Sequence, residues 1–235
     1  MIRRAAALLA CLLVAACGGG GGEERGTARL WITRDRGAEV LLTTTVPAGI
    51  SALEALDRVA DVETRYGGRY VQEIDGLAGS LSEQRDWYYF VNGYEGDRSA
   101  AEYRLHDGDV EWWDYRSWER PGEARLVVGA FPEPFLHGYG GRRRPVAVRY
   151  APALERGARE LGRLLRASSV APWDVPVPDG HNALRVAEGL QDGLRAGFCG
   201  GAGSAGDPVC FSLIGDPLQL AARPERVRYR YEWRP

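Results

Sequence analysis

The sequence contains no lysine and very little histidine. All of its basic side chains are arginines, 30 in 235 residues, and they are balanced by 32 acidic residues to a net charge of −2. This balance gives no strong attraction for polyanions, and no basic stripe is visible, so we expect no nucleic acid as a partner. The histidines, His106, His137 and His181, lie in separate turn or loop sequences, and none has a neighbour at metal-ligand spacing. The sequence therefore predicts no metal site.

The strongest enzyme motifs are also absent. The chain has no Gly-x-Ser-x-Gly nucleophile motif and no His-Glu-x-x-His helix. The glycine run at residues 18–22 lacks the Lys-Ser/Thr pair that follows a phosphate-binding loop. We therefore expect a protein that is not an enzyme, with no catalytic residues.

The N-terminus has the features of an export signal. Arg3 and Arg4 precede an apolar run, residues 5–16, that is too short to span a bilayer as a stable helix. It ends in Leu-Val-Ala-Ala-Cys17, which resembles the bacterial lipobox, in which the cysteine becomes the lipidated first residue. An ordinary secretory signal is the alternative interpretation. We expect a signal peptide at residues 1–17, a glycine-rich tether at 18–27, and an extracytoplasmic protein anchored to the membrane by lipid on Cys17.

The four cysteines reduce to two after export. Cys11 would leave with the signal and Cys17 would carry lipid, so Cys199 and Cys210 remain. Two remaining cysteines in an exported protein are typical of a disulfide.

An aromatic stretch at residues 86–93 is the most distinctive feature of the chain. It predicts a strand, because aromatic and β-branched side chains suit a pleated surface, and Asn92-Gly93 is a turn signal. Alternation places Trp87, Tyr89 and Val91 on one face and Tyr88 and Phe90 on the other. One face is expected to meet a helix.

The segments around this strand have recognisable patterns. Ser51 and Glu54 match a capping box that opens an amphipathic helix over residues 51–60. The strands predicted in this part lie at residues 28–33 and 39–46, which form a hairpin, at two short segments within 62–74, and at 110–115.

These motifs together carry a family resemblance. The ordered set comprises Gly-x-Ser-Ala-Leu-Glu-Ala-Leu from Gly49, Ile-Asp-Gly at 74–76, Trp-Tyr-Tyr-Phe-Val-Asn-Gly at 87–93, and Tyr-x-Leu-x-Asp-Gly-Asp-Val-x-Trp at 103–112. It resembles the transcobalamin C-terminal-like domain over residues 28–115. The resemblance implies an α+β, β-grasp-like domain at residues 28–118 with a ligand-binding or surface-binding role. It also implies a corrinoid such as cobalamin as a ligand, held together with a helical-barrel or transporter protein as partner.

The second half resembles no family. Strands are predicted at residues 125–131, 146–150, 209–213 and 227–233, with helices beginning at Pro152 and spanning 182–194. We expect a smaller α+β domain or extension at residues 125–235. The basic run Arg142, Arg143 and Arg144 suits lipid headgroups or a phosphate, but three arginines in a loop are also typical of a solvated surface.

The aromatic residues define the predicted site. We expect a small ligand or a partner protein to bind an aromatic sheet face containing the residues Trp87, Tyr88, Tyr89, Asn92, Trp112 and Trp113. The alternative is a structural or interaction module of the cell envelope in which the C-terminal domain buries that face.

Overall fold

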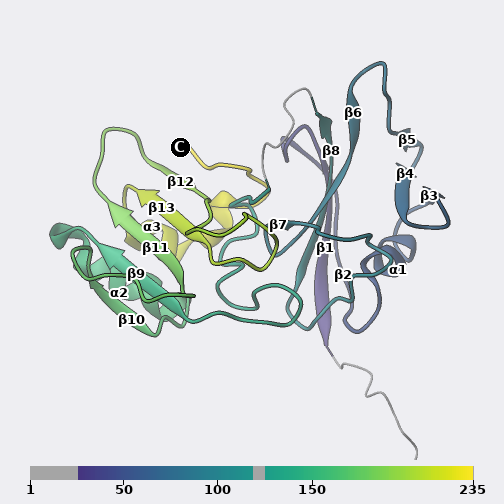
Figure 1. The fold of residues 1–235 in the computed structure, drawn as a ribbon. Helices are drawn as coiled ribbons and strands as arrows, with labels where there is room; N and C mark the ends of the chain where they lie inside the picture. The colour runs from purple at the N-terminus through teal and green to yellow at the C-terminus, as the bar shows by residue number, and fades with distance from the viewer. Residues whose placement is uncertain (1–25, 119–124, 235) are drawn as a thin grey trace, which may run out of the picture.

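The computed structural model describes residues 26–118 and 125–234. It shows a mixed α+β structure made mostly of sheet, with two halves that lie side by side (Figure 1). The predicted signal peptide, most of the tether and the lipidation residue Cys17 lie outside the described residues. No helix in the described part of the chain is long and apolar enough to cross a membrane.

The N-terminal half contains a five-stranded sheet in the order β2-β1-β8-β6-β7. Its strands are β1 (Thr27–Arg34), β2 (Glu39–Pro47), β6 (Arg85–Val91), β7 (Tyr94–Glu95) and β8 (Val110–Ser117). β1 and β2 form the predicted hairpin, β8 runs parallel to β1, and β6 runs antiparallel to β8. The strands predicted at residues 28–33, 39–46, 86–93 and 110–115 are therefore confirmed. The β-grasp arrangement itself stays a prediction.

A helix and a small sheet pack on one face of this sheet. Ser51 Oγ accepts a hydrogen bond from the Glu54 amide at 3.1 Å and so begins the predicted helix, α1 (Ala52–Asp57). The helix ends three residues earlier than predicted, and the Glu54 carboxylate pairs with Arg58 rather than reaching back. The small sheet consists of β3 (Val62–Arg65), β4 (Tyr70–Ile74) and β5 (Leu77–Ala78).

The C-terminal half contains a second sheet in the order β10-β9-β11-β13-β12. Its strands are β9 (Val146–Tyr150), β10 (Ser169–Pro172), β11 (Asn182–Ala187), β12 (Gly193–Arg195) and β13 (Cys210–Ile214). All neighbouring pairs are parallel except β12 with β13. The 3₁₀ turn η1 (Pro152–Leu154) and helix α2 (Glu155–Leu164) connect β9 to β10, and α3 (Pro217–Ala222) follows β13. A Cβ at Gly157 would lie 2.3 Å from Pro217 Cγ, so glycine permits the contact between α2 and α3.

The helix predicted over residues 182–194 is wrong. This segment forms β11 and β12, with a connection around Gly189 and the fully exposed Leu190. β11 pairs with a parallel strand on each side, and Leu184 and Val186 are buried on one of its faces while Arg185 between them is exposed. The apolar residues that suggested a helix, Leu184, Ala187, Leu190 and Leu194, belong to two strands and the connection between them, so their helical spacing does not mark one helical face.

Two further predicted strands are also wrong. Residues 125–131 form a loop with only an isolated bridge between Leu126 and Tyr94, although Val127 and Val128 are fully buried. Residues 227–233 leave the 3₁₀ turn η2 (Pro224–Val227) as an irregular segment, which we call the C-terminal tail together with Arg234. Val127, Ala130, Tyr229 and Tyr231 of these segments pack on the first sheet, and this contact does not require strand pairing. Trp233 instead forms an isolated bridge with Leu194 of β12.

The C-terminal tail covers the second face of the N-terminal sheet. The Tyr229 ring lies 4.8 Å from Trp31, and the Tyr231 ring lies 5.5 Å from both Phe90 and Trp112. The Tyr231 hydroxyl also donates to the buried Asp114 carboxylate at 2.8 Å. The aromatic sheet is thus packed on both faces, by α1 and β3–β5 on one side and by the tail on the other.

Candidate ligand-binding site

The six predicted ligand residues do not share one surface. Trp87, Tyr89 and Trp113 lie on the helix-covered face, whereas Tyr88 and Trp112 lie on the tail-covered face. The last of the six, Asn92, lies in the turn after β6. As ligand-binding residues all six stay a prediction.

Most of the predicted side chains already have partners within the protein. The Trp112 indole is fully buried and donates to Thr33 Oγ1 at 2.8 Å. The Trp87 indole donates to the Leu77 carbonyl at 2.7 Å, and the Trp113 indole donates to Glu111 at 2.6 Å. Tyr88 is partly exposed, with the Arg116 guanidinium 3.8 Å from the centre of its ring. These contacts favour structural roles for the aromatic residues in this conformation.

Asn92 connects the two halves. Its amide nitrogen donates to Asp109 Oδ1 at 2.6 Å and to the Gly138 carbonyl at 2.8 Å, and its amide oxygen accepts from the Val110 backbone amide. The side chain is completely buried. Asn92 therefore fixes the start of the loop that follows residue 138.

That loop forms one wall of a cavity of about 570 Å³, which we call the junction pocket. Its lining comes from three segments that are distant in the sequence, residues 97–98, 139–145 and 205–207. The first belongs to the N-terminal half, and the third belongs to the loop before β13. Volumes of roughly 300–1,000 Å³ are typical of small-molecule sites. The junction pocket is therefore large enough for a ligand.

The N-terminal wall is held by aromatic and ionic contacts. Tyr89 stacks on Trp113 with ring centres 5.1 Å apart, and its hydroxyl donates to the Arg98 carbonyl. Arg98 donates two hydrogen bonds to the Asp97 carboxylate, at 2.7 and 2.9 Å, and thereby lowers the pKa of that carboxyl. The Tyr139 hydroxyl donates to the same carboxylate at 2.7 Å. Tyr89 is the predicted residue that reaches the pocket wall through a hydrogen bond.

The middle wall carries the basic run. Arg143 donates to the carbonyls of Phe135, Leu165 and Arg166, the last two at the end of α2. Arg144 donates to the carbonyls of Gly206 and Gly180, at 2.8 and 3.3 Å. These bonds hold both guanidinium groups in place beside the pocket.

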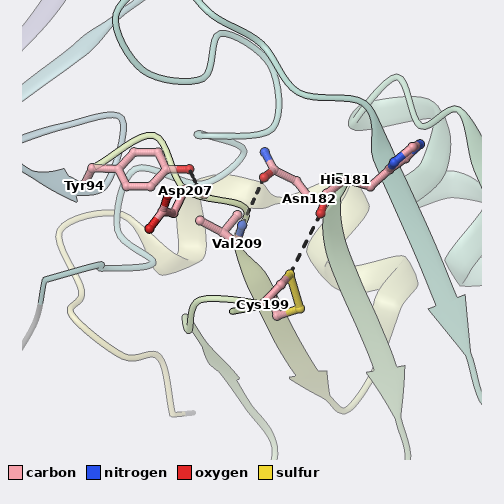
Figure 2. The surroundings of a disulfide bond; sticks show 7 residues. Tyr94, His181, Asn182, Cys199, Asp207 and Val209 are labelled. Carbon is pink, nitrogen blue, oxygen red and sulfur yellow. Dashed lines mark hydrogen bonds between the residues drawn. A yellow bond between two sulfur atoms is a disulfide. The ribbon is translucent and has the colours of Figure 1, made fainter. Parts of the chain in front are cut away.

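The third wall is fastened by the predicted disulfide. Cys199 and Cys210 are joined, which confirms the pairing expected from their number. Figure 2 shows this bond below the loop that carries Asp207, whose carbonyl accepts from the Tyr94 hydroxyl at 2.8 Å. The Asn182 side chain supports the same loop by accepting from the Val209 amide at 3.0 Å. The disulfide and these hydrogen bonds attach residues 205–207 to both halves.

The basic run at residues 142–144 is visible in the sequence, but the rest of the pocket is not. Asp97, Tyr139 and Asp207 stand in loops with no motif around them. Only the three-dimensional contact between the halves brings them together. Within the described residues no group of three or more His, Cys, Asp or Glu side chains is arranged to hold a metal ion.

A buried glutamate, Glu111, accepts a hydrogen bond from the Trp113 indole, which stacks on Tyr89. Glu111 is fully buried, and its Oε2 atom accepts no hydrogen bond from the described residues. Burial raises the pKa of this carboxyl well above its usual value. The stability that this carboxyl contributes is therefore fully present below the pKa of Glu111 in the unfolded chain. It is lost as the pH rises through the higher pKa of Glu111 in the folded protein.

We expect Glu111→Gln to remove this pH dependence. At pH 8 the free energy of unfolding of the variant should exceed that of the wild type by on the order of 1–3 kcal/mol. The reason is that the neutral glutamine replaces a buried carboxylate that lacks a full set of hydrogen-bond partners. The difference should close towards pH 4. Urea unfolding at several pH values measures it, with the exposed Glu225→Gln as control. A constant difference across this pH range would contradict the assignment.

Comparisons with known proteins find matches to part of the chain. A family described as a domain of unknown function (DUF4430) matches residues 49–117, inside the region that carries the transcobalamin-like motifs. A comparison with curated proteins finds no match. Neither this family nor the two solved structures that follow are described as enzymes.

Two solved structures are similar to part of the chain. Haptocorrin in complex with Cbi is 19% identical with a TM-score of 0.34, and the match covers 43% of this chain and 27% of haptocorrin. A candidate metal binding protein from Ruminococcus gnavus ATCC 29149 is 16% identical with a TM-score of 0.33, covering 39% of this chain and 97% of that one. The chain thus spans little more than a quarter of haptocorrin. Similarities of this size do not assign a fold or a ligand.

Proposed function

We propose that this chain is a lipid-anchored, extracytoplasmic binding protein that holds a small ligand in the junction pocket. The observation that carries the proposal is the pocket itself, about 570 Å³, with walls supplied by both halves of the chain. Ligand sites occur preferentially at such junctions. The chain acts by binding, without catalysing a reaction.

The rigidity of the walls supports binding. The Asp97 side is fixed by Arg98 and Tyr139, and the Asp207 side is fixed by Tyr94 and the disulfide. A pocket that is already ordered loses little conformational entropy when a ligand enters.

The export signal and the disulfide support the location. Disulfides persist in oxidising compartments outside the cytoplasm, and the Cys199–Cys210 bond agrees with export. The chain is anchored by lipid on Cys17 and displayed on a short tether. Cys17→Ser should leave the precursor unprocessed or release the protein into the medium, as shown by membrane fractionation. Unchanged membrane association of the processed variant would contradict lipid anchoring.

A corrinoid is the ligand that the transcobalamin-like motifs imply, bound together with a helical-barrel or transporter partner. Residues 23–235, which contain every described residue, can be titrated with cobalamin and cobinamide while tryptophan fluorescence is followed. Trp113 contacts Tyr89, which bonds to the pocket wall, so a bound corrinoid should quench emission. Absence of quenching up to high micromolar corrinoid would exclude this ligand and leave the pocket proposal standing.

The pocket proposal has its own test, which does not require the natural ligand. A set of small fragments is screened by ligand-observed NMR against the wild type and against Ala205→Trp, which adds a bulky ring to the pocket lining. The matched control is Ala153→Trp, on the exposed turn η1. We expect fragments that bind the wild type and Ala153→Trp but not Ala205→Trp. If no fragment distinguishes Ala205→Trp from the other two proteins, the pocket is not a binding site.

A second candidate function is a structural or interaction module of the cell envelope. The observation that favours this function is the packing of Tyr229 and Tyr231 over Trp112 and its neighbours. This packing covers the sheet face on which a ligand or partner would otherwise bind. Under this alternative the junction pocket binds nothing. The same fragment screen separates the two functions.

A further inference from the structure

The charges around the junction pocket are unevenly compensated. Of the described residues, four arginines and two aspartates line it. Arg98 is paired with Asp97 through two hydrogen bonds. In contrast, Arg142, Arg143 and Arg144 form no ion pair with any carboxylate of the described residues, although neighbouring like charges repel. The pocket therefore has an excess of positive charge on one wall.

The hydrogen bonds of this wall satisfy the donors of Arg143 and Arg144 without pairing their positive charges with a carboxylate. Among the described residues, Arg143 and Arg144 donate to backbone carbonyls, which carry no formal charge. Two acceptors of Arg143, the carbonyls of Leu165 and Arg166, lie at the negative end of the α2 dipole. The guanidinium groups of Arg143 and Arg144 are thus held in place while their positive charge remains available to a ligand. The remaining acidic residue of the lining is Asp207, and its Oδ2 atom accepts a hydrogen bond from the Ser204 backbone amide.

Arg142 differs from its two neighbours. Its side chain is exposed and donates no hydrogen bond to the described residues. A guanidinium carries five donors in a planar fork that matches two oxygens of a phosphate or carboxylate. Arg142 is therefore free to close on an anion that the two fixed arginines attract.

We propose that the junction pocket binds the phosphate group of a small molecule, with Arg142 as its direct donor and Arg143 and Arg144 supplying the surrounding positive charge. This inference rests on the proposed function. Phosphate suits the wall better than a single carboxylate, because it offers more oxygens and more negative charge to three guanidinium groups. The pocket volume leaves room for an organic part beside the phosphate.

The phosphate group can come from a soluble ester or from a lipid headgroup, since the proposed anchor would keep the pocket near a membrane. Two experiments separate these sources for residues 23–235. The first measures binding of inorganic phosphate and of glycerol 3-phosphate by calorimetry. The second measures sedimentation with vesicles of phosphatidylglycerol in phosphatidylcholine, compared with phosphatidylcholine alone.

The variant Arg142→Gln tests the proposal in both experiments. We expect its phosphate affinity to fall about tenfold or more, because a charge-assisted fork is lost. Arg142→Lys should fall less, because it keeps the charge. The matched control is Arg156→Gln, an exposed arginine on α2 outside the pocket, which should bind like the wild type.

Each outcome decides the proposal. Arg142-dependent binding of glycerol 3-phosphate supports it with a soluble source, and Arg142-dependent binding to anionic vesicles alone supports it with a lipid source. Equal affinity of Arg142→Gln and the wild type, or no phosphate binding in either experiment, overturns it. If fragments still bind the wild type and not Ala205→Trp while phosphate fails, the phosphate inference falls and the proposed function stands.

Discussion

Trp112→Ala is expected to lower the free energy of unfolding by about 3–5 kcal/mol, the usual loss when a large aromatic leaves a packed core. Trp112 is fully buried between the sheet and the C-terminal tail, beside Trp31, Phe90 and Tyr231. Its removal leaves a cavity and also leaves Thr33 Oγ1 without its indole donor. Urea unfolding followed by circular dichroism measures the change.

The control for this prediction is Trp173→Ala. Trp173 is 56% exposed, so its removal should change the unfolding free energy by less than about 0.5 kcal/mol. Equal losses for the two variants would contradict the packing of the tail on the aromatic face. In that case this face would be open, and the predicted ligand residues on it would regain their role.

Cys199→Ser/Cys210→Ser is expected to cost about 3 kcal/mol of unfolding free energy, because the unfolded chain loses a closed loop. The same variant should loosen the wall that carries Asp207 and so weaken any ligand of the junction pocket. Thermal unfolding and fragment binding together measure the two effects.

Reduction of the wild type provides the matched control for the disulfide. A reducing agent should lower the melting temperature of the wild type to that of the double variant and should leave the double variant unchanged. A double variant as stable as the oxidised wild type would show that the disulfide does not fasten the loop. Loss of stability with full fragment binding would show that the pocket wall is held by other contacts, such as the Tyr94–Asp207 hydrogen bond.

Local signals in the sequence predicted much of the N-terminal half. The hairpin of β1 and β2, the Ser51 cap and the turn at Asn92 each depend on residues close together in the chain. Asn92 adopts a positive φ of 51°, a conformation that asparagine tolerates better than most residues. Signals of this kind are visible without knowledge of the rest of the structure.

The predictions that failed concern segments whose partners are distant in sequence. β11 is a strand because β9 and β13 lie on either side of it. Tyr229 and Tyr231 alternate as in a strand, but they are placed by the ring contacts with Trp31 and Trp112. Apolar alternation records burial, and it does not specify which kind of backbone achieves that burial.

The candidate site depends even more on distant contacts. The basic run at residues 142–144 was visible in the sequence, but its lack of carboxylate partners among the described residues was not. Which carbonyls hold Arg143 and Arg144 follows from the packing of the loop against α2 and the disulfide-bonded loop. A site assembled from three distant segments has no contiguous motif.

Mapping ligand contacts on the backbone amides tests the junction pocket most directly. A ¹⁵N-labelled sample of residues 23–235 is titrated with glycerol 3-phosphate, with the best fragment from the screen used in parallel. We predict shifts at residues 97–98, 139–144 and 205–207, with amides of β2 and β3 unmoved. Shifts confined to the tail and to the strands beneath it, β6 and β8, would contradict the junction pocket and place the ligand on the aromatic face.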